Sequence, residues 1–136
     1  MTEITDKNYL GLDWGESKVG VALAHAETEV AVAYGIFKNN EDLLEELERL
    51  VKNETIGTVV VGIPKRKESP EEHPAKKFGQ NIANILGVKV VYTNEMFTTK
   101  LAKDTLKVLG KKHLGAQDDS EAAKILLQDW LDREVL

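Results

Sequence analysis

Cysteine is absent from this chain of 136 residues. Without it the protein can form no disulfide bond, no thiolate zinc site and no cysteine nucleophile, and this composition fits a reducing compartment. The sequence also lacks any run of about 18 apolar residues, and its opening residues, MTEITDKNY, lack the basic and apolar regions of a signal peptide. We therefore expect a cytoplasmic protein rather than a membrane or secreted one.

Proline and aromatic residues are scarce, with three prolines and 6% aromatic residues, but apolar residues are not. Hydrophobic residues make up 42% of the chain. A chain of this length typically buries roughly two-thirds of the surface that its unfolded form exposes, so it needs no disulfide bond or metal to hold a core. We expect a single domain that spans residues 1–136.

Positive charge is in deficit overall but concentrated locally. The formal net charge is -5 and the pI is near 5.3, which is not typical of a general nucleic-acid-binding protein. One stretch, from Thr98 to Gly115, nevertheless carries a single acid and five lysines, namely Lys100, Lys103, Lys107, Lys111 and Lys112. A polyanion would bind this stretch in preference to the acidic residues 39–50, although a solvated helix face is the simpler interpretation of such spacing.

Periodicity divides the chain into strands and helices. Three valine-rich apolar runs come first and predict strands joined by tight connections, hence antiparallel neighbours, at residues 9–13, 19–24 and 30–37. The apolar spacing then becomes helical over residues 41–52, with Asn39 or Asn40 as the expected N-cap and Gly57 after the end. Residues 58–63 are almost entirely apolar, which is typical of a strand covered on both faces.

The second half of the chain alternates between helix and strand. Residues 65–74 are polar and contain two of the three prolines, so we expect an exposed loop there. A helix is predicted over 75–86, ended by Gly87, and a buried strand follows at 88–93. Two further helices are predicted, at 98–109 and 120–133.

This order of elements predicts an α/β fold with a five-stranded mixed sheet. An antiparallel meander of three strands is followed by two parallel strands, and helices lie on both faces. Sites in such sheets lie beyond the carboxyl ends of strands, where the strand order reverses. Two acids fall at such ends: Asp13 after the first strand and Glu95 after the last.

Carboxylates at this edge suit a divalent cation. The candidates are Asp13, Glu95, and either Asp118 or Asp119 at the start of the last predicted helix. Together they would form a hard oxygen site for Mg²⁺ or Mn²⁺. Two such ions about 3.5–4 Å apart can activate water and stabilise the leaving oxygen in phosphodiester hydrolysis. The alternative is structural: the first two acids end a strand or are solvated, and one of the aspartates caps the helix beside Glu121.

Four segments, read in order, resemble one known family. They are GLDWGESKVGVA at 11–22, VVVGIP at 59–64, NEMFTT at 94–99 and DDSEAAKILLQDWLD at 118–132. Together they resemble the YqgF/RuvX family of pre-16S rRNA nucleases, also described as Holliday-junction-resolvase-like, and the likeness covers nearly the whole chain. The resemblance implies a ribonuclease H-like fold, which agrees with the order of strands and helices.

The resemblance also implies a catalytic site. The acids of the family motifs correspond to Asp13, Glu95 and Asp119, which would bind metal and carry catalysis. The implied activity is that of a metal-dependent endonuclease that hydrolyses phosphodiester bonds in RNA, in 5′-end processing of precursor 16S rRNA, with Mg²⁺ or Mn²⁺ as cofactor. The RNA backbone would be steered by Lys100, Lys103 and Lys107.

The sequence departs from the family pattern at several positions. The family usually has Asp-Glu-Arg before its threonines, whereas this chain has Asn94 and Met96 on either side of its glutamate, and methionine cannot make the bidentate bonds of arginine. Lys18 stands where arginine is common and is a candidate contact to the nucleic acid, and Lys65 and Arg66 are candidate replacement contacts to phosphate. Two alternatives therefore stay open: a non-catalytic protein with a degenerate site that binds nucleic acid or a ribosome-assembly partner, and a resolvase of branched DNA such as a Holliday junction.

The remaining candidates have simpler interpretations. The three histidines, His25, His73 and His113, all fall in polar stretches, so we expect them to be exposed and without a catalytic role. Trp14 could stack on a base, but packing beside the strand end is the preferred interpretation. The oligomeric state is open between a monomer and a weak homodimer, since symmetric cutting of branched DNA would need a dimer.

Overall fold

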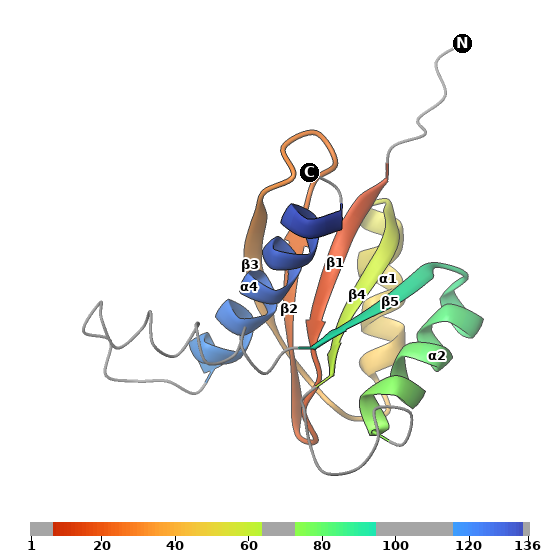
Figure 1. Ribbon diagram of the computed structural model, residues 1–136. Coiled ribbons are helices and arrows are strands. Elements are labelled where there is room, and N and C mark those ends of the chain that lie inside the picture. Colours follow the sequence, from red (N-terminus) through yellow and green to blue (C-terminus); the bar gives the residue numbers. More distant parts are fainter. Residues whose placement is uncertain (1–6, 64–72, 95–115, 135–136) are drawn as a thin grey trace.

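The computed structural model describes residues 7–63, 73–94 and 116–134 of the chain. Its strands are β1 (Asn8–Asp13), β2 (Lys18–Ala24), β3 (Ala31–Lys38), β4 (Ile56–Ile63) and β5 (Lys89–Asn94). Its helices are α1 (Leu43–Asn53), α2 (Pro74–Leu86) and α4 (Ala116–Glu134) (Figure 1). The loop predicted at 65–74 lies mostly outside the described residues, and the helix predicted at 98–109 lies wholly outside them.

The strands form one sheet in the order β3-β2-β1-β4-β5. β1, β2 and β3 make an antiparallel meander, while β4 pairs parallel with β1 and β5 pairs parallel with β4. The predicted mixed sheet is therefore confirmed, and every strand boundary lies within two residues of its predicted place. The chain adds β2 and β3 on one side of β1 and then β4 and β5 on the other, so the strand order reverses at β1.

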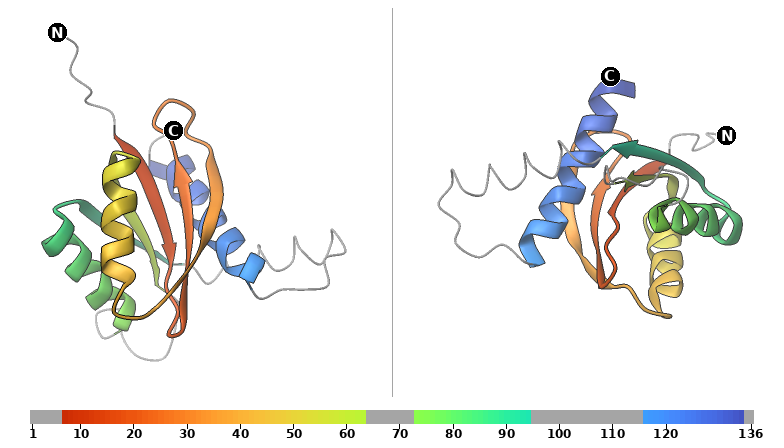
Figure 2. Two further views of the ribbon diagram at one scale, coloured as in Figure 1. Left: turned by 180° about the vertical axis from the view of Figure 1, so that it is seen from behind. Right: turned by 60° about the horizontal axis from the view of Figure 1, so that its bottom comes forward.

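Helices cover both faces of the sheet, as the sequence predicts. α1 and α2 lie on one face and α4 lies on the other (Figure 2). Alternate residues of β1 therefore enter two different cores: Leu10 and Leu12 pack beneath α1 and α2, whereas Tyr9 packs beneath α4, with its ring 5.9 Å from that of Trp130. The apolar strand β4 serves both cores in the same way. None of the described helices is long and apolar enough to cross a membrane.

α1 starts later than the sequence predicts. Its N-cap is Asp42, not Asn39 or Asn40, and the Asp42 side chain makes no capping hydrogen bond. Asn40 instead closes a turn before the helix: its side-chain oxygen accepts a hydrogen bond from the Asp42 N–H at 2.9 Å, and its carbonyl accepts one from the Leu43 N–H at 3.1 Å. The same asparagine chemistry serves helix caps and turns, so the residue type alone did not separate the two.

α2 begins at a buried histidine. His73, predicted to be exposed, is 1% exposed and is the N-cap of α2, where its Nδ1 accepts a hydrogen bond from the Ala75 N–H at 3.0 Å. Its ring also meets Trp14 edge to face, with the centroids 5.6 Å apart. The prediction was wrong because the polar neighbours of His73 in sequence concealed a helix end that lies inside the core. The other end of α2 is as predicted, with Gly87 at a φ of 69°, a conformation that favours glycine.

α4 lies directly on the sheet at two glycines. A Cβ atom built on Gly20 would overlap the Asp119 carbonyl oxygen, and one built on Gly11 would lie 2.8 Å from Leu127 Cβ. Neither position has room for a side chain. The helix can therefore approach this closely only because β1 and β2 present bare backbone at these two positions.

α4 is about one turn longer at its start than predicted. It begins at Ala116 rather than near Ser120, so Asp118 and Asp119 lie in its first turn and neither is the N-cap. The capping interpretation of these aspartates is therefore wrong, although acids in a first turn still suit the positive end of the helix dipole. The run Asp-Asp-Ser offers three good cap residues, which conceals the earlier start.

Replacing Gly20 by alanine should destabilise the fold, because the new methyl group would push α4 off the sheet. We expect the free energy of unfolding to fall by about 2–4 kcal/mol in urea denaturation. Gly35→Ala in β3 is the matched control: nothing lies within 4 Å of its built Cβ, so its stability should be unchanged or slightly higher. Equal stability of the two variants would contradict the contact between α4 and β2.

His73→Ala removes a helix cap and a buried ring together. We expect the free energy of unfolding to fall by about 2–4 kcal/mol, of which about 1 kcal/mol comes from the cap and the rest from lost packing. His25→Ala, at an exposed position, should change it by less than about 0.5 kcal/mol. Thermal unfolding monitored by circular dichroism measures the stability of both variants. If His73→Ala were as stable as the unaltered protein, the His73 ring would not be buried.

Candidate functional site

Asp13 ends the central strand at the edge of the sheet where the strand order reverses. Its partners in the neighbouring strands are Gly20 in β2 and Gly62 in β4, and Gly62 pairs in turn with Thr93 in β5. These four residues form one line across four strands, which we call the Asp13 row. The carboxylate thus has a glycine on each side, and neither neighbour has a side chain that would crowd a ligand.

Asp13 lies on the α4 side of the sheet. Tyr9 and Gly11, at the two alternate positions before it, both face α4. Alternation along the strand puts Asp13 on this same face and Leu12 on the opposite one. Because Asp13 is only partly buried, a ligand in solvent can reach its carboxylate.

α4 brings a second carboxylate to the row. The close contact at Gly20 sets the backbone of Asp119 against the residue that pairs with Asp13. Asp119 is also partly exposed, and it lies on the same face. The fold therefore brings together two of the three acids that the sequence singled out. The side chain of Asp118, the alternative to Asp119, lies outside the described part of the structure.

Lys18 adds a positive charge to this pair of acids. Its Nζ lies 3.4 Å from Asp119 Oδ2. The two side chains remain 45% and 32% exposed, so solvent screens the ion pair and its contribution to stability is at most about 1 kcal/mol. The ammonium group thus partly neutralises the carboxylate without locking it, and a divalent cation can compete for Asp119.

The donor set of the site suits a hard divalent cation in part. Asp13 and Asp119 offer carboxylate oxygens, the ligands that Mg²⁺ and Mn²⁺ prefer. Within residues 7–63, 73–94 and 116–134, no three side chains of His, Cys, Asp or Glu come together closely enough to hold an ion. The third predicted ligand, Glu95, is the residue after β5 and lies outside these ranges.

A further cation, which sequence reasoning missed, lies at the far end of the Asp13 row. Arg133, near the end of α4, donates a hydrogen bond from Nη2 to Thr93 Oγ1 at 3.0 Å and pairs with Asp129 at 2.9 Å. The only signal in the sequence is the i,i+4 spacing to Asp129, which is typical of a solvated pair on one helix. That spacing could not show that the arginine also reaches β5. An exposed guanidinium is a good donor to phosphate.

Trp14 is a packing residue, as predicted. It packs against the core beneath α1 and α2, next to His73, and so lies on the face opposite Asp13. His25 is exposed, also as predicted. The other candidates lie outside the described residues: Lys65, Arg66, Lys100, Lys103, Lys107 and His113.

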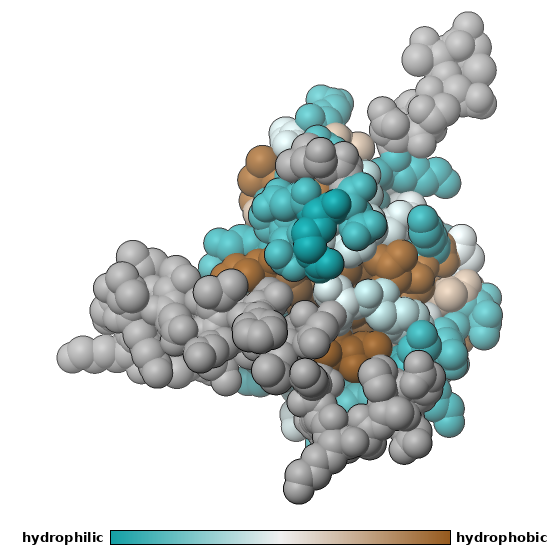
Figure 3. Space-filling model, viewed as in Figure 1, coloured by the Kyte–Doolittle hydropathy of each residue, from teal (hydrophilic) through white to brown (hydrophobic). Residues whose placement is uncertain are grey.

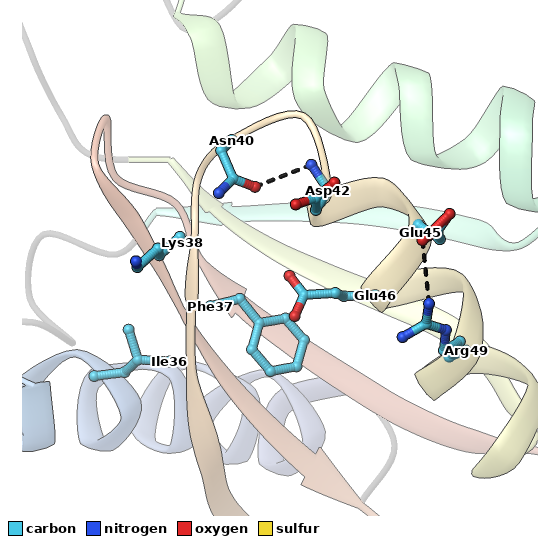
Figure 4. Close-up of a pocket in the computed structure, with 8 residues that line it drawn as sticks. All are labelled: Ile36, Phe37, Lys38, Asn40, Asp42, Glu45, Glu46 and Arg49. Atoms are coloured by element: carbon cyan, nitrogen blue, oxygen red, sulfur yellow. Dashed lines mark hydrogen bonds and ion pairs between the residues drawn. The ribbon is translucent and has the colours of Figure 1, made fainter.

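A hollow of about 590 Å³ opens on the opposite face of the sheet, between the end of β3 and α1 (Figure 4). Its lining residues are Ile36, Phe37, Lys38, Asn40, Asp42, Glu45, Glu46 and Arg49. Charges of both signs line it, and Glu45 and Arg49 pair with each other at 3.1 Å. Neither Asp13 nor Asp119 borders the hollow, so we place the candidate site at the Asp13 row, where the two acids lie together with Lys18 beside Asp119.

Comparison with known proteins gives one matching family. A family model described as "RuvX: Holliday junction resolvase" matches residues 7–133. A "Putative pre-16S rRNA nuclease" of Orientia tsutsugamushi (strain Ikeda) is 35% identical over 133 residues, which cover 93% of this chain and 85% of the relative. Proteins of the same name are 33% identical in Sulfurihydrogenibium sp. (strain YO3AOP1), over 91% of this chain and 89% of theirs, and 31% identical in Chloroflexus aurantiacus (strain ATCC 29366 / DSM 635 / J-10-fl), over 95% and 89%.

Solved structures share the fold at low sequence identity. RuvC of T. thermophilus in complex with a Holliday junction substrate superposes with a TM-score of 0.54 at 14% identity, covering 93% of this chain and 95% of RuvC. The resolvase of Fowlpox virus, in complex with Holliday junction DNA, gives a TM-score of 0.51 at 14% identity, over 91% and 98%. At these identities the likeness concerns the fold alone, and it confirms the ribonuclease H-like architecture expected from the sequence.

Proposed function

This chain belongs to the RuvX family, and on that premise we propose that it is a metal-dependent endonuclease that hydrolyses phosphodiester bonds in RNA. The observation that carries the proposal is the meeting of Asp13 and Asp119 at the point where the strand order reverses. The glycines on either side of Asp13 leave space for a phosphate and its cation. No protein nucleophile is needed in such a site.

In this proposal Asp13, Glu95 and Asp119 hold Mg²⁺ or Mn²⁺. When bound, such ions supply Lewis acidity, which activates a water molecule and stabilises the leaving oxygen. The protein contributes position: a central strand fixes Asp13, and the seating of α4 on Gly20 fixes Asp119. Lys18 orients the Asp119 carboxylate and limits the negative charge of the site.

The substrate that we propose is precursor 16S rRNA at its 5′ end, in the cytoplasm. The support is the shared name of relatives from three bacteria that align over nearly the whole chain. Arg133 and a set of basic residues outside the described part would contact the phosphates: Lys65, Arg66, Lys100, Lys103 and Lys107. A net charge of -5 is consistent with a substrate held by a few local contacts rather than by the whole surface.

Two other functions have an observation in their favour. Resolution of branched DNA is supported by the family description and by the Holliday junction substrate in the RuvC structure. Binding of nucleic acid or of a ribosome-assembly partner without cleavage is supported by Asn94 and Met96, which stand where the family usually has Asp and Arg.

Asp13→Asn should abolish cleavage, because it removes a charged ligand while keeping the shape of the side chain. With a labelled panel of RNAs that includes a precursor 16S rRNA end, and with Mg²⁺ or Mn²⁺, we expect the rate to fall by at least about 100-fold. The matched control is Asp42→Asn, an exposed aspartate at the start of α1 whose side chain makes no capping hydrogen bond. Asp42→Asn should cut at the rate of the unaltered protein. A chelator should stop cleavage by Asp42→Asn and by the unaltered protein alike.

The same assay separates the three functions. Cleavage of RNA that is lost in Asp13→Asn supports the nuclease. Cleavage confined to a four-way DNA junction would assign the chain to the resolvases instead. RNA binding without cleavage in the presence of either metal ion would favour the non-catalytic binding function. A cleavage rate that Asp13→Asn leaves unchanged would show that Asp13 takes no part in catalysis.

Lys18→Gln should strengthen the binding of a divalent cation, because it removes the charge that competes for Asp119. The ion pair is exposed, so we expect the dissociation constant for Mn²⁺, measured by electron paramagnetic resonance without any RNA, to fall by up to about fivefold. Lys52→Gln is the control, since Lys52 pairs with Glu48 at 3.6 Å on α1, away from the site. An unchanged or weaker affinity in Lys18→Gln would contradict a cation site at Asp119.

A further inference from the structure

Two lysines lie side by side at the same edge of the sheet as Asp13. Lys18, the first residue of β2, pairs in register with Lys38, the last residue of β3. Side chains that lie opposite each other in paired strands share one face of the sheet, so the two ammonium groups extend in the same direction. Like charges in this arrangement repel each other and weaken the strand pair. The pair therefore indicates a role other than stabilising the fold.

The strand ladder brings these two side chains as close together as neighbouring strands allow. Asn39, the residue after β3, donates a backbone hydrogen bond to the Ser17 carbonyl at 2.9 Å. Hydrogen-bonded and non-hydrogen-bonded pairs alternate along an antiparallel ladder, so Lys18 and Lys38 form a non-hydrogen-bonded pair, with Cα atoms only about 4.5 Å apart. The Asn39 side chain also donates to the Gly15 carbonyl at 2.6 Å, which ties the end of β3 to the turn between β1 and β2. The backbone that carries both lysines is thus fixed.

The lysine pair lies on the same face of the sheet as the candidate site. Ile36 pairs with Gly20, the glycine beneath α4. Alternation along β3 therefore puts Lys38, two residues after Ile36, on the α4 side as well. Figure 4 shows the side chains of Ile36 and Lys38 on the same side of β3. The 3.4 Å contact with Asp119 places Lys18 on this face too.

The charge of Lys38 is not neutralised by the protein. Lys18 has a carboxylate partner on α4, whereas Lys38 forms no ion pair with any carboxylate in the described ranges. Figure 3, which views the molecule from the α4 side, shows that the outer side of this helix is hydrophilic. The described cations of α4, Lys124 and Arg133, are each paired with an acid of the same helix. Lys38 is exposed and leaves one positive charge open to an anion from solvent.

We propose that Lys18 and Lys38 together bind one phosphate of the nucleic-acid backbone, beside the Asp13 row. Each ammonium group has three N–H donors, and a phosphodiester has two free oxygens, one for each lysine. A phosphate between the two ammonium groups replaces their mutual repulsion by two attractions. This inference rests on the proposed function, because it gives the nucleic-acid substrate a second point of contact on the same face.

The spacing suits a phosphate close to the bond that the Asp13 row would cut. Lys18 lies two residues, about 6.8 Å, beyond the row along β2, and β2 lies about 4.8 Å from β1. Lys38 lies one strand further in the same direction. Lysine side chains are long and flexible enough to cover these offsets. Arg133 lies on the opposite side of Asp13, at β5, so the two contacts place the backbone across the strands.

Binding of RNA in the presence of a chelator tests the phosphate site without any cleavage. The probe is a short fluorescein-labelled single-stranded RNA with the sequence of a precursor 16S rRNA 5′ end. It is titrated with the full chain, and fluorescence anisotropy measures the Kd. We expect Lys38→Gln to raise the Kd by about three- to tenfold at low salt, because it removes one charge from the phosphate contact. Lys38→Arg keeps the charge and should leave the Kd within about twofold of the original.

Lys89→Gln is the matched control for the loss of one positive charge. Lys89 is exposed and is the first residue of β5. It lies two residues before Val91, which packs in the core beneath α4, so it is on the same face as Lys38 but at the opposite edge of the sheet. The Kd of Lys89→Gln should equal that of the unaltered protein. Circular dichroism confirms that each variant is folded.

The salt dependence of the Kd shows whether the two lysines share one phosphate. Each phosphate contact with a single strand contributes about 0.7 to the slope of log Kd against log salt concentration. We therefore expect the double variant, Lys18→Gln with Lys38→Gln, to lower this slope by about 0.7. Two lysines that contact separate phosphates would lower it by about 1.4 instead.

Three results would overturn the proposal: no binding of RNA by the unaltered protein, equal Kd values for Lys38→Gln and Lys89→Gln, or a slope lowered by about 1.4 in the double variant. None of these measurements involves cleavage. RNA cleavage together with binding that is indifferent to Lys38→Gln would therefore contradict the phosphate site and leave the nuclease activity supported. Binding that changes as expected, in a protein that does not cut, would support the phosphate site and contradict the nuclease.

Discussion

The contact of α4 with two glycines of the sheet is the constraint on which the rest of the structure depends. At Gly20 and Gly11 the strands offer bare backbone, and the helix lies closer to them than any side chain would permit. One contact serves two purposes. It closes the core above β1 and β2, and it sets Asp119 next to the strand position opposite Asp13. Packing and site geometry are therefore coupled here, so a change that loosens the helix also separates the acids.

Most of the fold could be predicted from the sequence because its signals are periodic. The change from valine-rich strands to helical spacing after residue 40 located the meander and α1, and the apolar run of β4 indicated burial on both faces. The errors lie where one residue type serves several structures. Asn40 closes a turn rather than capping a helix, and His73 is buried although its neighbours in sequence are polar. The aspartates of α4 suggested a cap where the helix had already begun.

The candidate site was only partly predictable, for a different reason. Strand ends can be located from sequence, so Asp13 could be placed, and the family pattern pointed to Asp119. The cations could not be placed, because their partners are far away in sequence. Lys18, the first residue of β2, pairs with Asp119 in the first turn of α4, and Arg133 in the last turn of α4 reaches Thr93 in β5. Such contacts depend on where a helix crosses a sheet, which no local pattern records.

The place of α4 in the chain has a consequence for biosynthesis. Asp13 belongs to the first strand, and Asp119 to the last described helix. A nascent chain emerging from the ribosome can form the meander early, but it holds one acid without the other until α4 has left the exit tunnel. The face that α4 covers, with Ala22, Val60 and Ala24, is bare during that interval and needs either a rapid arrival of the helix or shielding by a chaperone. The pair of acids is therefore complete only after α4 has been made, which separates the folding of the meander from the appearance of the site.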